Sequence, residues 1–130
     1  MSAEEEVRRA GEVLVTAFGS GDLDTYFGCF ADDATFLFHT TDRLLTSTGE
    51  YRWEWARWAD EDGFRVLGCS TDSTVVQVFG DTAVLTHRVR TTVSTHAGTE
   101  ELRERETIVF ALRDGRWIGV HEHLSVDPGA

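Results

Sequence analysis

The sequence predicts an α+β fold in which three N-terminal helices pack in a curved, mostly antiparallel sheet. Apolar residues recur at helical spacing in the first half of the chain, between Val7 and Trp58. From Phe64 onward the pattern changes to β-rich runs separated by turn signals. At 130 residues the chain fits a single domain, residues 1–130, that can bury one core without disulfides or metals.

The first two helices are expected to meet at a glycine-rich turn. Ser2 and Glu5 form a capping-box pair, which predicts that a helix begins there. This helix should end at Gly19-Ser20-Gly21, and Asp22 is placed to cap a shorter second helix. The stretch GSGD does not follow a strand, so it is not a phosphate-binding loop.

A strand and a third, aromatic-rich helix should follow. Asp32-Asp33 is interpreted as a turn that leads into a short strand over 34–39. Ser47 and Glu50 repeat the capping-box spacing, and Gly63 is expected to end the helix that they begin. This third helix carries Tyr51, Trp53, Trp55 and Trp58.

Four β-rich runs fill the rest of the chain, separated by turn signals at Gly80-Asp81, Ala97-Gly98 and Asp114-Gly115. Each run is about a dozen residues long, against a usual strand of about five or six. Long antiparallel strands coil strongly, so we expect the sheet to wrap around the helices.

The register of the last hairpin decides which side chains face the core. A two-residue turn at Asp114-Gly115 is one possibility, and a three-residue loop over 113–115 is the other. We favour the longer loop because it sets Phe110 against Ile118 and gathers the apolar residues on one face. In that register Ile108 lies opposite Val120.

The favoured register places Glu106 opposite Glu122 on the core face. Trp117, His121 and His123 then point outward, where the two histidines would have a surface or interface role. Carrying the pairing across an Ala97-Gly98 turn places His87 beside Ile108 and Val89 beside Glu106. The polar residues expected on the inner face are His87, Glu104, Glu106, Glu122 and, less directly supported, Asp72.

Charge and composition exclude several classes of function. The formal net charge of −11, with 12 arginines and no lysine, argues against nucleic acid or an anionic membrane as a partner. The absence of lysine also excludes a Schiff-base mechanism. Cys29 and Cys69 are interpreted as reduced packing thiols of a cytoplasmic protein, because the N-terminus has no apolar signal core.

Glu106, Glu122 and His87 are the candidate catalytic residues. Two opposed carboxylates on a buried face repel each other, so one tends to hold a proton beside a basic partner. A nearby histidine can shuttle that proton. The structural alternative is that Arg52 or Arg57 from the third helix pairs with the glutamates. A metal site is a third possibility, but no ligand spacing supports it, and no metal or other cofactor is expected.

An apolar substrate pocket is expected beside these residues. Its candidate lining is Tyr26, Phe38, His39, Trp53, Ile108 and Phe110.

The order of these segments resembles a known family. FADDATF after two helices, an aromatic-rich third helix and ERETIVFALRDGRWIGVHEHLS are together similar to the SnoaL-like branch of the nuclear transport factor 2 and ketosteroid isomerase superfamily. The closing segment is also similar to the association domain of calcium/calmodulin-dependent kinase II. The resemblance implies a cone-shaped, cystatin-like fold with a deep pocket, commonly dimeric through the outer face of the sheet.

Activity does not follow from this resemblance, because the fold hosts isomerases, cyclases, dehydratases, epoxide hydrolases and assembly domains. Phe38 and Leu14 stand where the steroid isomerases of this superfamily have their general base and a tyrosine. Ile108 and Leu124 stand where the kinase association domain has two pocket arginines. Neither steroid isomerase activity nor a pocket for a carboxylate ligand is therefore expected. The prediction is a homodimer that binds a small apolar molecule and performs cofactor-independent acid–base chemistry. The alternative is a non-catalytic ligand-binding or assembly module.

Overall fold

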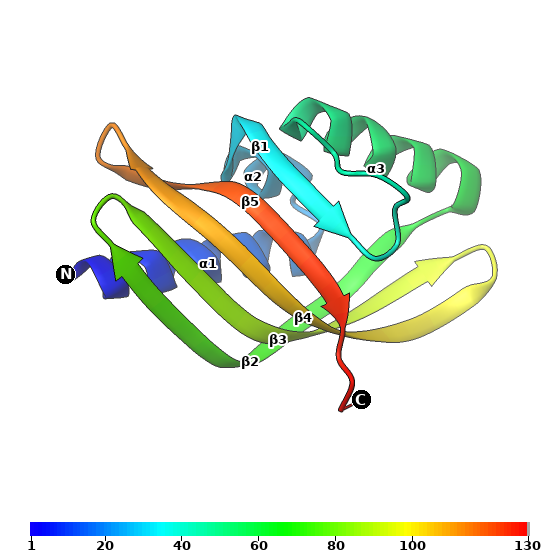
Figure 1. Ribbon diagram of the computed structural model, residues 1–130. Coiled ribbons are helices and arrows are strands. Elements are labelled where there is room, and N and C mark those ends of the chain that lie inside the picture. Colours follow the sequence, from blue (N-terminus) through cyan, green and yellow to red (C-terminus); the bar gives the residue numbers. More distant parts are fainter. Residues whose placement is uncertain (130) are drawn as a thin grey trace.

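The α+β fold predicted from the sequence is confirmed by the computed structural model, which describes residues 1–129. Three helices, α1 (Ala3–Ser20), α2 (Leu23–Gly28) and α3 (Thr48–Asp62), lie against one five-stranded sheet (Figure 1). The strands are β1 (Phe30–Phe38), β2 (Arg65–Phe79), β3 (Thr82–Thr95), β4 (Gly98–Arg113) and β5 (Arg116–Val126). None of the helices in this range is both long and apolar enough to cross a membrane.

The helix boundaries follow the capping residues that the sequence predicted. The side chains of Ser2 and Ser47 accept hydrogen bonds from the backbone N–H three residues later, at the starts of α1 and α3. Asp22 does the same for α2. Gly21 and Gly63 end α1 and α3 with φ values of 76° and 66°, a left-handed conformation that glycine adopts without strain.

The sheet has the order β1-β5-β4-β3-β2. Its four long strands are joined by hairpins, and β1 pairs with β5 in parallel, so the sheet is mostly antiparallel as predicted. Helix α1 lies against β2, and α3 lies beside β1 at the other edge (Figure 1). The curved sheet and the helices thus enclose the space between them.

Strand β1 begins earlier than the sequence suggested. Asp32 and Asp33 do not form a turn: they lie within β1, where its register with β5 shifts between Phe30 and Thr35. Phe30 pairs with Gly119, and a Cβ on Gly119 would lie 2.6 Å from the Phe30 ring. Glycine at this position is therefore what allows the ring to pack against β5.

The predicted register of the last hairpin is wrong. Asp114 and Gly115 both have positive φ and form a two-residue turn, so Phe110 pairs with Gly119 and not with Ile118. Trp117 is consequently buried, where we expected it to point outward. Ile118 is partly exposed, where we expected it in the core.

A β-bulge restores the inward direction of the site residues. The register shifts between Val109 and Phe110, and the additional residue on β5 is Val120. Beyond it, Ile108 pairs with Glu122 and Glu106 pairs with Leu124. The predicted cross-strand partner of Glu106 is therefore wrong, although Glu106 and Glu122 both face inward.

The β3–β4 pairing is offset by two residues from the prediction. Thr95 pairs with Gly98, so the turn is His96-Ala97 and lies one residue earlier than expected. Every side chain stays on its predicted face, but His87 now lies directly opposite Glu106 instead of Ile108. Asp72 pairs with Arg88 and is exposed, so its predicted place on the inner face is wrong.

Candidate active site

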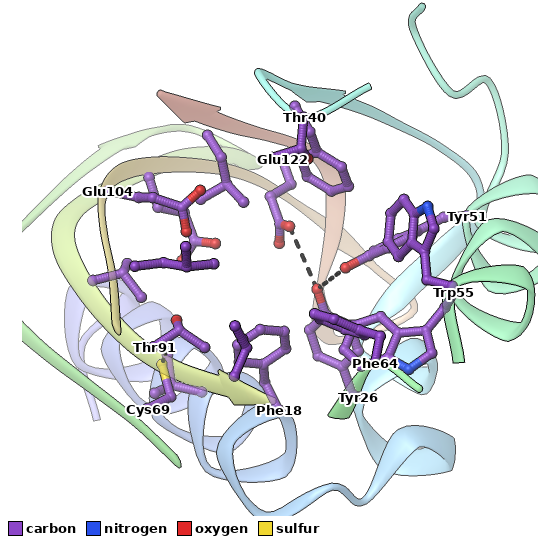
Figure 2. Close-up of a pocket in the computed structure, with 18 of the residues that line it drawn as sticks. Phe18, Tyr26, Thr40, Tyr51, Trp55, Phe64, Cys69, Thr91, Glu104 and Glu122 are labelled. Carbon is purple, nitrogen blue, oxygen red and sulfur yellow. Dashed lines mark hydrogen bonds between the residues drawn. The ribbon is translucent and has the colours of Figure 1, made fainter. Parts of the chain in front are cut away.

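A cavity of about 270 Å³ opens between the sheet and the helices. All three helices and strands β1 to β5 contribute to its wall (Figure 2). The wall is mostly apolar, and its polar part consists chiefly of carboxyl groups from β4 and β5. A cavity of this size and character is typical of a site for a small organic molecule.

Glu122 is the most deeply buried acidic group of this wall, with 1% of its surface exposed. Its Oε1 accepts a hydrogen bond of 3.4 Å from the Tyr26 hydroxyl, and Tyr26 in turn lies 2.9 Å from the Tyr51 hydroxyl (Figure 2). The Oε2 atom is buried and has no hydrogen-bond partner within residues 1–129. This atom is therefore free to act on a bound molecule.

Burial raises the pKa of Glu122 well above its ordinary value, and the nearby charge of Glu106 raises it further. The hydrogen bond from Tyr26 opposes this shift without cancelling it. Burial likewise raises the pKa of Tyr26 and Tyr51 well above that of a free phenol. The direction of these shifts favours the protonated form of Glu122 and of the two phenols beside it.

Glu106 is held by a histidine on the neighbouring strand. The Nε2 atom of His87 lies 2.5 Å from Glu106 Oε1, and the His87 and Glu106 side chains are 3% and 9% exposed. His87 does not itself line the main cavity. Its imidazole thus touches the cavity only through Glu106, which makes it a positioning residue.

Glu104 repeats this arrangement two residues earlier on β4. Its Oε2 lies 2.5 Å from His39 Nε2, and its carboxyl group lines the cavity (Figure 2). Burial raises the pKa of Glu104, and the His39 contact works in the opposite direction. His39, predicted as a pocket residue, reaches the cavity only through Glu104.

The arginines of α3 do not pair with these glutamates. Arg52 contacts Asp24, and Arg57 contacts Glu54 and Glu61. In the part of the chain that the structure describes, His39 and His87 contact the carboxyl groups of Glu104 and Glu106, and no arginine or histidine lies at salt-bridge distance from Glu122. The structural alternative of an arginine–glutamate pair is thus wrong.

The predicted pocket residues divide into three groups. Tyr26 and Phe38 line the cavity. Ile108 and Phe110 are 0% and 1% exposed and belong to the filled core. Trp53 is 61% exposed on the far side of α3, so it does not line the cavity.

The sequence analysis missed the aromatic side of the cavity. Tyr51, Trp55 and Trp58 recur at positions i, i+4 and i+7 of α3 and line the cavity together with Phe64. That helical spacing was a usable signal, because it separates these three residues from Trp53.

The two outer-face histidines are placed apart from the cavity. His121 Nδ1 lies 2.8 Å from the Thr35 hydroxyl on β1, and burial lowers the His121 pKa. His123 is exposed. Among residues 1–129, no group of three or more His, Cys, Asp or Glu side chains is arranged to hold a metal ion.

Solved structures resemble this fold over nearly the whole chain. A nuclear transport factor 2-like protein of unknown function in nutrient uptake from Rhodospirillum rubrum has a TM-score of 0.79 at 22% identity, covering 93% of this chain and 98% of its own. The calcium/calmodulin-dependent kinase II hub of S. rosetta has a TM-score of 0.76 at 21% identity, covering 98% of both chains.

A protein of unknown function with a cystatin-like fold from Nostoc punctiforme has a TM-score of 0.69 at 17% identity, covering 98% of this chain and 95% of its own. These similarities establish the predicted cystatin-like fold and no activity. No curated protein matches the sequence. The profile of the SnoaL-like domain, however, matches residues 7–128. The chain is therefore a member of the SnoaL-like family, as its sequence motifs predicted.

Proposed function

We propose that this protein binds a small, largely apolar molecule in the cavity and performs cofactor-independent acid–base chemistry on it. The observation that carries the proposal is the buried Glu122 Oε2, which faces the cavity without a partner beside Glu106. Burial raises the pKa of Glu122, which suits it to act as the acid, and the neighbouring Glu106 carboxyl group can act as the base at the same site. Isomerisation, cyclisation, dehydration and epoxide opening all use such a pair.

In this mechanism Glu106 takes a proton from the substrate and protonated Glu122 gives one to another atom of it. The electron pair left by the first proton then moves within the substrate, where it shifts a double bond or expels a leaving group. In epoxide opening Glu106 instead takes the proton of a water molecule whose oxygen forms a bond to an epoxide carbon, while the C–O bond of that carbon breaks and Glu122 protonates the released oxygen. With Nε2 protonated, His87 donates to Glu106 and keeps that carboxylate aimed at the cavity.

The experiment that tests this function starts with capture of the ligand. The protein is incubated with a metabolite extract, and native mass spectrometry identifies the small molecule that stays bound. The purified compound is then returned to fresh enzyme and followed by chromatography and NMR. The proposal expects catalytic conversion into an isomer, a cyclised product, a dehydrated product or a diol. A compound that binds and is recovered unchanged would contradict it.

A non-catalytic assembly module is the second candidate, favoured by the similarity to the S. rosetta hub. Both candidates include a homodimer that forms through the outer face of the sheet. That face carries the exposed Leu37 of β1 and the exposed His123 of β5, which pair in register. Sedimentation velocity at micromolar concentration is expected to report a dimer, and a strict monomer would contradict the assembly proposal.

A further inference from the structure

The cavity wall carries acidic side chains and no basic ones. Within the described residues its acidic members come from α3, β4 and β5, and no arginine or histidine belongs to it. The acidic members are Asp62, Glu100, Glu104, Glu106 and Glu122. Such a wall offers an anionic ligand no positively charged partner, whereas it offers a cation several carboxyl groups.

Aromatic rings supply most of the remaining wall. The negative face of an aromatic ring attracts a cation, and the same ring packs well against hydrocarbon. The rings of the wall are Phe18, Tyr26, Phe38, Tyr51, Trp55, Trp58 and Phe64. A wall that combines carboxyl groups with aromatic rings suits a molecule with a positively charged head and an apolar body.

Glu122 gives an independent indication of a donor on the ligand. The residue is 1% exposed, its Oε2 lacks a hydrogen-bond partner among residues 1–129, and its carboxyl group points into the cavity (Figure 2). Buried polar atoms in folded proteins nearly always have a hydrogen-bond partner. The partner that suits a carboxyl oxygen among other carboxylates is a positively charged N–H group.

We infer that the ligand of this cavity is an organic ammonium ion with an apolar, preferably aromatic, body. Its N–H groups donate to Glu122 Oε2 and to Glu106, and its hydrocarbon part lies against Trp55, Trp58 and Phe64. This inference rests on the proposed function, because it names the substrate class of the same site.

Three probes of nearly equal shape test the inference by titration calorimetry: 2-phenylethylammonium, 2-phenylethanol and phenylacetate. We expect the ammonium ion to bind at least roughly 10-fold more tightly than the alcohol, since a charge-assisted hydrogen bond is stronger than a neutral one. Phenylacetate should not bind.

Matched variants separate the site from the overall charge. Glu106→Gln and Glu122→Gln should each weaken ammonium binding by roughly 10-fold or more. Glu101→Gln removes the same charge from an exposed position on β4 and should leave the affinity unchanged. Circular dichroism of each variant verifies that it is folded.

Equal or tighter binding of the alcohol or of phenylacetate would overturn the inference, and so would the absence of ammonium binding. Neither result decides the proposed function, because that depends on turnover of the captured compound. If the ammonium ion binds as expected but the captured compound is recovered unchanged, the acid–base function fails and the cation site remains.

Discussion

Glutamine in place of Glu122 is expected to stabilise the protein at neutral and alkaline pH and to flatten its pH dependence. Burial and the charge of Glu106 hold the Glu122 pKa well above its ordinary value in the folded state. In the unfolded chain the same group titrates near pH 4.3. The folded protein therefore binds more protons than the unfolded chain between these two pKa values.

The sign of the effect follows from this difference. The stabilisation from protonated Glu122 is fully present below about pH 4.3 and is lost as pH rises toward the folded pKa. Through that window the free energy of unfolding falls by up to about 1.4 kcal/mol per pH unit for this one group. The pKa of Glu104 is also raised, so Glu104 adds to the fall in the free energy of unfolding with pH, in the wild type and in Glu122→Gln alike.

Urea denaturation of the wild type and Glu122→Gln across this pH range measures the effect. The difference between the two free energies of unfolding should grow in favour of the variant as pH rises. Glu101→Gln provides the control for removal of one negative charge and should follow the wild-type curve. Parallel curves for wild type and Glu122→Gln would show that Glu122 is not protonated in the folded protein.

Glu106→Gln is expected to lower turnover of the captured substrate by roughly 100-fold or more, the usual scale for removing a general acid or base. Glutamine can keep a hydrogen bond to His87 but cannot accept a proton at neutral pH. The substitution also removes a negative charge beside Glu122. The melting temperature should therefore rise slightly while activity falls.

This combination separates a catalytic role from a structural one. If Glu106→Gln keeps full turnover and has a higher melting temperature, Glu106 has no catalytic role and only repels the Glu122 carboxyl group. Removing the Glu106 charge should also lower the Glu122 pKa and shift the pH profile of the residual activity toward acid. Circular dichroism of Glu106→Gln accompanies the assay, because only a folded variant tests the catalytic role of Glu106.

The helices and their boundaries could be predicted from the sequence because their signals are local. Ser2, Asp22 and Ser47 cap helices in the structure as they do in the pattern. The strand pairings depend on the position and length of each hairpin turn. A change of one residue in a turn changes the cross-strand partner of every residue in that hairpin. The turn at His96-Ala97 and the two-residue turn at Asp114-Gly115 were both misjudged.

The sequence predicts the inward direction of Glu122 correctly although the predicted register is wrong. The β-bulge at Val120 is the reason. The bulge compensates for the shorter turn, so side chains beyond it return to the predicted face. Gly119, directly before the bulge, is a local signal for it, because an isolated glycine inside a strand often marks a bulge. The contact between His39 and Glu104 joins distant strands and was not anticipated.

The most direct measurement of the central claim is the protonation state of Glu122 itself. Infrared spectroscopy detects a protonated carboxyl group by its C=O stretching band, which is distinct from the bands of carboxylates. At neutral pH we predict such a band in the wild type, its loss in Glu122→Gln and its retention in Glu101→Gln. A wild-type protein with no protonated carboxyl band at neutral pH would contradict the account, because its acid would then be missing.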